Sequence, residues 1–444
     1  MISTIKKGIV AVAEILHLKL FQHEMSDQMR KFLRHLSWSV AGGITASAIM
    51  MIINIYAGRL MGPEEFGKYS LITTIAQILI VPMLFGLDVS SLISISKNND
   101  ITDRKKIISS SIFFVFLSSI LLTIIFIFSL NYLNLRFSLG KSFFVIAFIY
   151  SLLVGYKAFL DSIIRGLHLF RYQFFGKITE ILILGIIFYF TFVLGNRHDY
   201  YFFVISLIFG FLVLLAIYFK KIIPYITHFD FSSLLKQLSL GRIIFIGTVL
   251  AVGFNSIDKL IIVKYLTFTD LGIYSAYYMV SVNLMAQLTQ MFINVFLPSI
   301  SGINYRVVVK KIDRLFLICS LPLIILMIGV ILVAISLFGA KYSINLNLVL
   351  SFSILSALYV YLSINGNILV SISKEIYRHF VLLQTLINIF HILAYGLLIF
   401  FHAISVQALV ILYILNAMIV IIIQKYLIKS YINMSIDYLV KHDK

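Results

Sequence analysis

Twelve apolar runs, each about twenty residues long, constrain the fold of this chain more strongly than any other feature of its sequence. A helix needs about 20 apolar residues to cross the hydrocarbon of a bilayer. Lipid cannot satisfy a free backbone group, so a spanning segment must be a helix or part of a closed barrel. Barrel strands would alternate in polarity over about ten positions, and these runs do not alternate. We therefore expect membrane-spanning helices at residues 37–58, 67–90, 107–131, 142–160, 178–195, 200–219, 243–263, 272–297, 315–339, 346–370, 379–401 and 404–424.

The composition excludes a water-soluble globule. Hydrophobic residues make up 61% and charged residues only 12% of the 444 residues, and the mean hydropathy is +1.03. A soluble domain is closer to half apolar and a quarter charged. The predicted fold class is therefore an all-α integral membrane protein with 12 transmembrane helices.

The distribution of basic residues predicts the orientation of these helices. The chain has 36 Lys and Arg residues and a net charge of +18. With the N-terminus in the cytoplasm, 27 of these residues fall in the two tails and the even-numbered connections, and seven in the odd-numbered ones. By the positive-inside rule, both termini are cytoplasmic. The basic surplus then reflects topology and contact with anionic head groups, and we expect no nucleic-acid partner.

Part of the sequence repeats after about half the chain. Gly67-x-Tyr69-Ser70 matches Gly272-x-Tyr274-Ser275 at an offset of 205 residues. Self-similarity at half-length indicates two copies of one multi-helix unit. Each copy has an even number of helices, so both enter the membrane in the same direction and the repeat is parallel. We expect two six-helix lobes.

Polar segments set the expected domain boundaries. Residues 220–242, which contain Pro224 and four basic residues, form the longest polar interruption after the N-terminal segment. The predicted organisation is a cytoplasmic amphipathic segment at 1–35, an N-lobe at 36–219, a cytoplasmic linker at 220–242, a C-lobe at 243–424 and a cytoplasmic tail at 425–444.

The sequence lacks the motifs of the common enzyme classes. It has no Walker loop, no GxGxxG, no HExxH and no GxSxG. Its single cysteine, Cys319, excludes an internal disulfide and a Cys-based metal site, and we expect it to be a small core residue. Connections of about ten residues outside the membrane are too short for a folded domain. We therefore expect no enzyme activity, no metal and no cofactor, and a function carried out between the helices.

Ionisable residues within the helices are the candidate functional residues, since each costs roughly 2.5–3.5 kcal/mol at the bilayer centre. Lys157, Asp161 and Arg165 are spaced four residues apart and share one helix face. Glu180 enters the next predicted helix at a similar depth. Two interpretations stay open. Lys157 and Arg165 reach the head groups and pair with Asp161, or the group lines a charged cytoplasmic vestibule.

Asp258 and Lys259 lie about five residues inside the outer end of their predicted helix, some ~7 Å deep. Adjacent residues diverge by about 100° on a helix, so the two side chains cannot simply pair and at least one must face a polar interior. At the repeat offset, Asn54 corresponds to Lys259. Arg59 corresponds to Lys264 in the same way. A wet cavity between the two copies, edged by these groups, explains the placement, and pairing with another helix is the alternative.

Several motifs resemble those of one transporter family. The run from Arg59 to Ser70, followed by Phe85-Gly86-Leu87-Asp88, resembles the first-hairpin signature of the polysaccharide-transporter family, the Wzx-type flippases of the multidrug/oligosaccharidyl-lipid/polysaccharide exporter superfamily. The runs 258–262 and 271–276 resemble the second-half signature. Arg165-Gly166-Leu167-x-x-Phe170-Arg171 is similar to the family's connection between helices 4 and 5. The second copy has Thr267-Phe268 where the first has Gly62-Pro63, so the internal symmetry is degraded there.

The resemblance implies a bacterial inner-membrane protein whose two lobes surround a central cavity. It implies transfer of undecaprenyl-diphosphate-linked repeat units of O-antigen or another surface polysaccharide, as in lipopolysaccharide biosynthesis, to the periplasmic leaflet. A polysaccharide polymerase and a chain-length regulator are the expected protein partners, beside membrane lipid. Lys259, Lys157, Arg165 and Arg59 are then candidates for attracting the diphosphate, with Asn54 as a polar lining residue. If a proton or cation gradient drives transfer, Asp258, Asp161 or Glu180 is the coupling carboxylate.

Three other functions are less compatible with the sequence. A drug/cation antiporter of the same superfamily should have an acidic cavity, whereas the deep charges here are mixed. A lipid II flippase would have two more helices. A polysaccharide polymerase or ligase would carry a large periplasmic loop.

Overall fold

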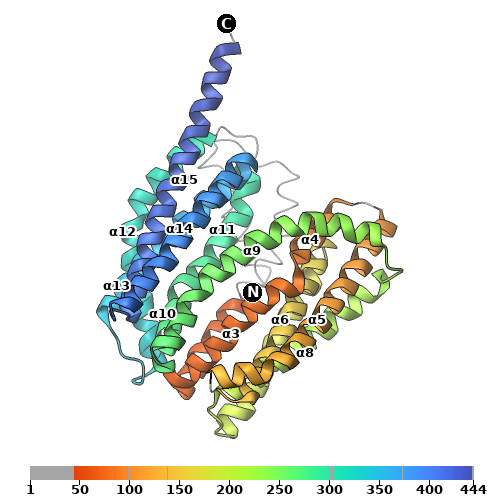
Figure 1. Ribbon diagram of the computed structural model, residues 1–444, viewed down its shortest axis with the longest axis vertical. Helices are drawn as coiled ribbons and strands as arrows, with labels where there is room; N and C mark the ends of the chain where they lie inside the picture. Colours follow the sequence, from red (N-terminus) through yellow and green to blue (C-terminus); the bar gives the residue numbers. More distant parts are fainter. Residues whose placement is uncertain (1–44, 99, 138, 301–304, 373, 443–444) are drawn as a thin grey trace. The chain divides into compact units, whose positions relative to one another are not determined.

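The protein is helical throughout the part of the chain that the structure describes. The computed structural model describes residues 45–98, 100–137, 139–300, 305–372 and 374–442, and these contain no strand (Figure 1). The predicted amphipathic segment at 1–35 lies outside the described residues. The all-α fold class is confirmed.

Contacts divide the chain into two compact units, the first ending at Lys264 and the second beginning at Tyr265. The first unit contains the helix Thr45–Met61, α3 (Pro63–Leu84), α4 (Leu87–Lys97), α5 (Ile101–Phe137), α6 (Lys141–Gly166), α7 (Phe170–Phe188), the π-helix η1 (Tyr189–Leu194), α8 (Tyr200–Ile222), the 3-10 turn η2 (Ile223–Tyr225) and α9 (Phe231–Tyr265). The second contains α10 (Phe268–Tyr278), the π-helix η3 (Met279–Asn283), α11 (Leu284–Ile300), α12 (Tyr305–Phe338), α13 (Leu346–Ile372), α14 (Lys374–Phe400) and α15 (Val406–His442).

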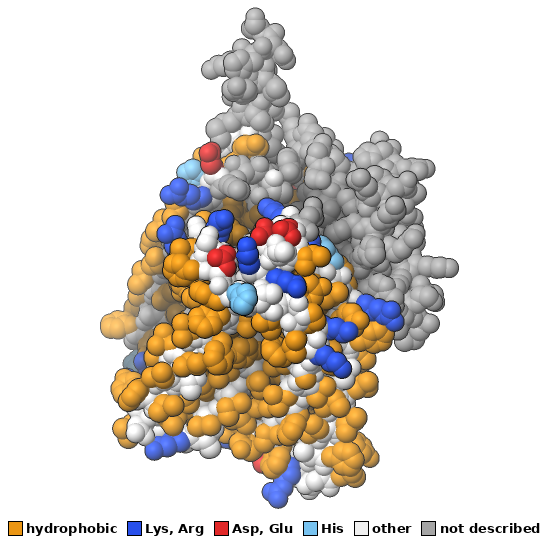
Figure 2. Space-filling view, turned by 90° about the vertical axis from the view of Figure 1, so that its right-hand side faces the viewer, with side chains coloured by type: hydrophobic (Ala, Val, Ile, Leu, Met, Phe, Trp, Pro, Cys, Tyr) orange, Lys and Arg blue, Asp and Glu red, His pale blue; other side chains and the backbone are white. Residues whose placement is uncertain are grey.

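All twelve predicted spans coincide with these helices, the first of them from Thr45 onward. Ten helices among the described residues are long and apolar enough to cross a membrane. Their outward faces are apolar, and hydrophobic side chains cover most of the described surface in Figure 2. Cys319, expected in the core, is instead exposed on α12, because in a membrane a small apolar side chain can face lipid at no cost.

The two units share one packing pattern. In the first unit α6 is central and packs against α3, α5 and α8, and α8 also packs against α7 (Figure 1). In the second unit α13 is central and packs against α11, α12 and α15, and α15 also packs against α14. These helices correspond in order after an offset of six predicted spans. The duplication inferred from the sequence is therefore visible in the packing.

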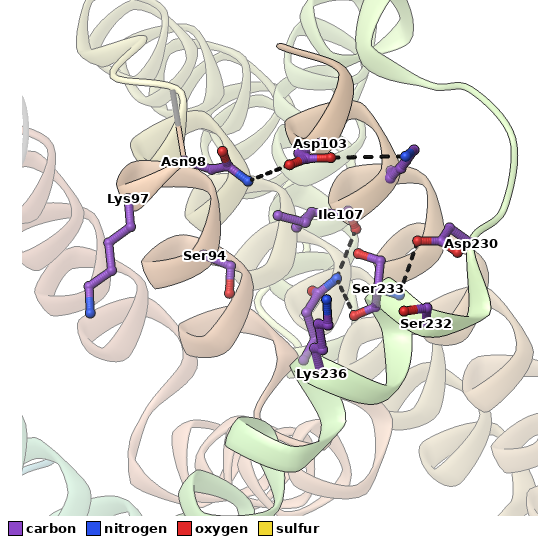
Figure 3. Close-up of a pocket in the computed structure, with 11 residues that line it drawn as sticks. Ser94, Lys97, Asn98, Asp103, Ile107, Asp230, Ser232, Ser233 and Lys236 are labelled. Carbon is purple, nitrogen blue, oxygen red and sulfur yellow. Dashed lines mark hydrogen bonds and ion pairs between the residues drawn. The ribbon is translucent and has the colours of Figure 1, made fainter. Parts of the chain in front are cut away.

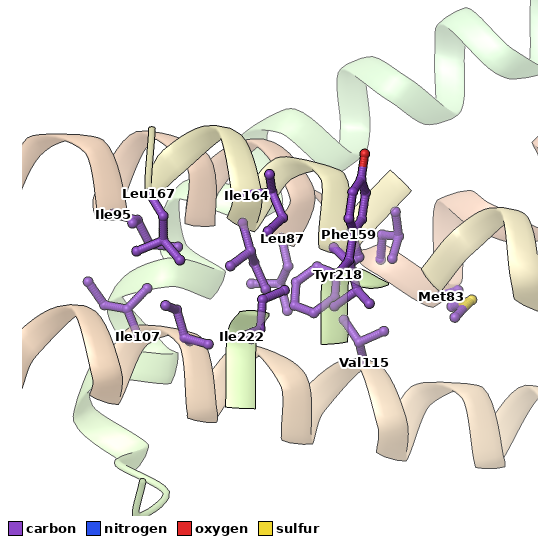
Figure 4. Close-up of a cluster of buried hydrophobic side chains, with 14 of the residues drawn as sticks. Met83, Leu87, Ile95, Ile107, Val115, Phe159, Ile164, Leu167, Tyr218 and Ile222 are labelled. Carbon is purple, nitrogen blue, oxygen red and sulfur yellow. The ribbon is translucent and has the colours of Figure 1, made fainter. Parts of the chain in front are cut away.

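Each unit has its own apolar core. The core of the first unit is a cluster of side chains from α3 to α6 and α8, including Leu87, Ile163 and Tyr218 (Figure 4). A second cluster, which includes Ile368 and Phe380, lies in the second unit. Lipid is as apolar as these side chains, so close packing rather than loss of water holds such helices together.

The repeat offset holds at the start of α3 and α10. Gly62 has a φ of 81° and Pro63 is the first residue of α3, so this glycine and proline form the turn into the helix. At the same offset, Thr267 precedes α10, accepts a hydrogen bond from the Asp270 backbone and completes a capping box with that residue. The second copy thus replaces a glycine–proline turn with a side-chain cap, and each solution starts a helix at the equivalent position.

The predicted helix at 67–90 is broken. α3 ends at Leu84, and both Phe85 and Gly86 have positive φ, 49° and 74°, before α4 begins. The break brings the backbone at Gly86 against Gly241 of α9. A Cβ on Gly86 would clash with the Gly241 backbone, and a Cβ on Gly241 would clash with the Phe85 carbonyl oxygen. The motif Phe85-Gly86-Leu87-Asp88 therefore marks a helix break and a close backbone contact.

Much of the predicted linker at 220–242 is helical. α8 continues to Ile222, η2 follows, and α9 begins at Phe231. The chain divides by contacts after Lys264, whereas the duplication places the start of the C-lobe at 243, and that boundary stays a prediction. The predicted tail at 425–444 continues α15 as far as His442.

Candidate functional site

A buried ion pair joins the middle of α6 to α7. The ammonium of Lys157 pairs with Oε1 of Glu180 and lies 4.5 Å from the centroid of the Phe211 ring on α8. The Glu180 side chain is 8% exposed and that of Lys157 28%. A charge this far from water is tolerated when it is paired, so the presence of each residue explains how the other can be buried.

One turn further along α6, Asp161 collects donors from three helices. Gln173 Nε2 donates to both carboxylate oxygens at 3.0 and 3.1 Å. The Tyr218 hydroxyl donates to Oδ1 at 3.1 Å. Two cations also approach the carboxylate, with Arg165 Nε at 3.4 Å and Lys177 Nζ at 3.8 Å.

We call the residues Lys157, Asp161, Arg165, Gln173, Lys177, Glu180 and Tyr218 the α6–α8 polar seam. It contains three cations and two carboxylates. The Arg165 side chain is 41% exposed, and besides Asp161 it interacts electrostatically with Asp88 of α4, so carboxylates balance the cations at that end. Of the pairing expected with Asp161, Arg165 makes it, whereas Lys157 pairs with Glu180 instead; the charged vestibule stays a prediction.

The ion pair lies deeper than the sequence indicated. α6 continues to Gly166, so Lys157 lies nine residues, or about 14 Å, from the end of its helix. Glu180 lies ten residues into α7, which is again about 15 Å. The pair therefore lies well inside both helices.

Asp258 and Lys259 are both buried in α9, at 5% and 9% exposure. The Lys259 backbone N–H donates to Asp258 Oδ1 at 2.8 Å, which is a local bond within the helix and not a pairing of the two charges. Neither side chain faces lipid. The sequence predicted that at least one of them faces a polar interior; both are buried, and the wet cavity stays a prediction.

The two residues predicted from the first copy differ in environment. Asn54, on the helix Thr45–Met61, is 7% exposed, and its Nδ2 donates to the Met50 carbonyl at 2.8 Å. Arg59 is exposed. Asn54 therefore shares the burial of its repeat equivalent Lys259, whereas Arg59 does not.

Sequence reasoning missed Gln173, Lys177 and Tyr218 as members of the seam. No spacing rule links them to Asp161, because they come from other helices and meet it only through packing. A similar cluster was missed in the second unit, where Asp313 accepts from the Tyr361 hydroxyl at 2.8 Å and pairs with Lys425. The signal available was a polar or charged residue inside an apolar run, which identifies the residue but not its partner.

Among the described residues, no group of three or more His, Cys, Asp or Glu side chains is arranged to hold a metal ion. The charges of the seam pair with one another.

The fold is shared with membrane exporters and flippases of solved structure. The inward-facing conformation of a multidrug resistance MATE family transporter of the MOP superfamily superposes with a TM-score of 0.66, at 12% identity over 89% of this chain and 98% of that chain. The lipid II flippase MurJ, in an inward closed conformation, gives 0.59 at 15% identity over 87% of each chain. A MOP superfamily transporter from Pyrococcus furiosus gives 0.52 at 15% identity over 90% of this chain and 96% of that chain. At these identities the likeness establishes the fold.

Sequence comparison establishes the family. No curated protein matches the chain. The family described as polysaccharide biosynthesis protein matches residues 32–304, which is more than half of the sequence. The chain belongs to the polysaccharide biosynthesis protein family.

Proposed function

We propose that the protein is a flippase that moves undecaprenyl-diphosphate-linked oligosaccharide repeat units from the cytoplasmic to the periplasmic leaflet by alternating access. The observation that carries the proposal is the combination of a polysaccharide biosynthesis sequence with an exporter fold. A pathway that builds a polysaccharide outside the cell from precursors made inside needs a membrane protein for this step. The repeat units would be those of O-antigen or another surface polysaccharide.

The chemistry of such a precursor fits the charges of the chain. Its diphosphate is anionic, its sugar polar and its tail apolar, so the head needs a cationic polar path while the tail stays in lipid. Lys259 is a cation removed from lipid inside a spanning helix. The α6–α8 polar seam adds the partly exposed guanidinium of Arg165. In this proposal Lys259 and Arg165 attract the diphosphate and Asn54 lines the path. Arg59 attracts the diphosphate at the outer end of that path. Lys157 contributes through its pair with Glu180.

The charge distribution favours both termini in the cytoplasm. The family resemblance implies that the membrane is a bacterial inner membrane. The polymerase and the chain-length regulator that act on the flipped units would be its protein partners.

Replacing Lys259 by alanine tests the site. In a strain that depends on this protein, we expect Lys259→Ala to abolish surface polysaccharide while the protein still inserts, because the diphosphate loses its deep cation. Lys220→Ala, at the exposed end of α8, is the matched control and should leave the polysaccharide unchanged. Normal polysaccharide in the Lys259→Ala strain would remove Lys259 from the site.

The coupling carboxylate can be identified with isosteric amides. We expect one of Asp161→Asn, Glu180→Gln and Asp258→Asn to lose stimulation by an imposed proton or sodium gradient while keeping downhill exchange in proteoliposomes. The amide keeps the shape of the carboxylate and removes the charge that a transported cation would compensate. If gradients do not change the wild-type rate, ion coupling is wrong.

The closest alternative is a drug/cation antiporter of the same superfamily. It predicts uptake of a cationic dye by proteoliposomes against a proton gradient, with no movement of lipid-linked saccharide. The charges of the seam are mixed and include two lysines, which opposes this alternative, because such an antiporter should have an acidic cavity.

A further inference from the structure

A polar pocket opens on the first unit, where α4 ends and where α5 and α9 begin. Its volume is about 520 Å³, within the range of about 300–1,000 Å³ that is common for small-molecule sites. Figure 3 shows side chains from all three helices around it. The lining residues are Ser94, Lys97, Asn98, Asp103, Lys106, Ile107, Asp230, Ser232, Ser233, Lys236 and Gln237.

The charges of the pocket favour an anion. Three lysines face two aspartates around it. Asp230 is engaged as the cap of α9, accepting from the Ser233 backbone at 3.1 Å. Asp103 accepts from Asn98 Nδ2 at 3.3 Å and pairs with Lys106 at 3.9 Å.

Other donors of the pocket are uncommitted. Within the described part of the chain, neither Lys97 nor Lys236 makes an ion pair or hydrogen bond through its ammonium group. The hydroxyls of Ser94 and Ser232 likewise make no hydrogen bond to a described residue. These two ammonium groups and two hydroxyls are available to a ligand.

The pocket is held in shape by three consecutive serines of α5. Ser109 Oγ accepts from the Thr227 backbone at 2.6 Å, and Ser110 Oγ accepts from the Asp230 backbone at 3.0 Å. Ser111 donates to Gln237 Oε1. These bonds fix the segment before α9 and the first turns of α9 to α5.

A third helix, α4, joins the same network. Ser91 of α4 donates to Gln237 Oε1 at 2.8 Å, and Gln237 is only 2% exposed. The three helices that supply the lysines are thus bonded to one another beneath the pocket, so the backbone positions that carry the donors are held relative to one another.

The pocket lies where head groups are found. In α5 the charged turn at 103–106 is followed at once by the apolar run from Ile107, and in α9 Lys236 precedes the apolar run that starts at residue 243. This is the end of the helices predicted to be cytoplasmic, where basic pockets between helices bind phosphate-bearing head groups.

We propose that this pocket binds a phosphate group, with Lys97, Lys106 and Lys236 as its cationic ligands and Ser94 and Ser232 as hydroxyl donors. The two helix N-termini nearby contribute little, since Asp230 already caps α9. At the start of α5, Asp100 accepts from the Thr102 backbone N–H and hydroxyl, and these bonds hold the pKa of Asp100 below its usual range. The inference rests on the membrane fold and is independent of the proposed flippase activity.

A charge-neutralised variant tests the proposal. Purified full-length protein, delipidated in a neutral detergent, would be titrated with short-chain phosphatidylglycerol, and binding followed by native mass spectrometry and thermal shift. We expect the variant K97Q/K106Q/K236Q to bind on the order of a hundredfold more weakly, because each lysine near the surface contributes roughly a factor of five. The control K220Q/K221Q/K429Q loses the same charge outside the pocket and should bind like the wild type.

Two further measurements complete the test. Ser232→Trp adds a bulky side chain at an exposed position of the pocket without changing its charge, and should also weaken binding. This variant still tests the pocket if the triple variant misfolds. Inorganic phosphate and phosphatidylcholine form separate arms. Protection by phosphatidylglycerol alone identifies an anionic lipid as the source of the phosphate, and equal protection by inorganic phosphate identifies a soluble one. Equal binding of every phosphate-bearing probe to the triple variant and its control would overturn the proposal.

Discussion

Asp161 shows how single residues solve the problem of charge inside this membrane protein. Its carboxylate is surrounded by an amide, a phenol and two cations from α6, α7 and α8. One of these contacts, with Arg165, could be predicted from the spacing of four residues, because that spacing places two side chains on one helix face. The others could not, since Gln173, Lys177 and Tyr218 lie on other helices and no rule of spacing gives the rotation of one helix against another.

The Lys157–Glu180 pair should behave as one unit in stability. Lys157→Met leaves a buried carboxylate without its cation, and we expect a loss of roughly 2–4 kcal/mol, somewhat below the cost for a fully buried pair because Lys157 is partly exposed. The double variant Lys157→Met/Glu180→Leu should recover most of this loss, since it removes both charges.

Thermal unfolding of the purified variants in detergent measures the coupling. A cycle that also includes Glu180→Leu should give a coupling energy between about 0.5 and 3 kcal/mol. Additive losses would show that the two residues do not depend on each other.

At the scale of elements, the α3–α4 break makes a close contact with α9 within the first unit. Phe85 stacks on Phe245 with ring centroids 4.4 Å apart, and a Cβ on Gly241 would lie 2.8 Å from the Phe85 carbonyl oxygen. Together with the bonds to Gln237, this contact holds the first half of α9 to helices that precede it by more than one hundred residues. This explains why a helix assigned by duplication to the C-lobe groups with the first unit.

Adding a methyl group at this contact should be costly. Gly86→Ala meets the Gly241 backbone and also forces alanine to a φ of 74°. We expect a loss of roughly 2–4 kcal/mol from overpacking and left-handed strain. Gly247→Ala, elsewhere on α9 with nothing within 4 Å of the new Cβ, should be neutral or gain up to about 1 kcal/mol from helix propensity. Equal melting temperatures for the two variants would contradict the close contact.

The sequence predicted elements better than it predicted their ends and breaks. Hydropathy alone locates the spans, because an apolar run of about twenty residues is typical of a membrane-spanning helix. It did not reveal the interruption at Phe85–Gly86, where Pro82 was the only local sign, nor the helix within the segment 220–242. The residues before that helix bond to serine hydroxyls of α5 that are distant in sequence, and no local pattern predicts such bonds.

At the scale of the whole molecule, duplication is the property from which the other arguments follow. The same pattern of helix packing recurs in both units, and α3 and α10 begin at the repeat offset with different N-terminal caps. The polar residues have not been duplicated in the same way. The first unit has the α6–α8 polar seam, and the second has the cluster of Asp313, Tyr361 and Lys425. We infer that the repeat supplies the scaffold and that the charges were specialised separately in each half.

A transfer assay with the purified protein tests the proposed function most directly. Liposomes would carry a fluorescent undecaprenyl-diphosphate-linked oligosaccharide in both leaflets, and a reagent that cannot cross the membrane would report the exposed pool. With the wild-type protein, the whole pool should become accessible. With protein-free liposomes or the Lys259→Ala variant, only the outer leaflet should react. Wild-type liposomes that react no further than protein-free ones, with and without an ion gradient, would contradict the flippase.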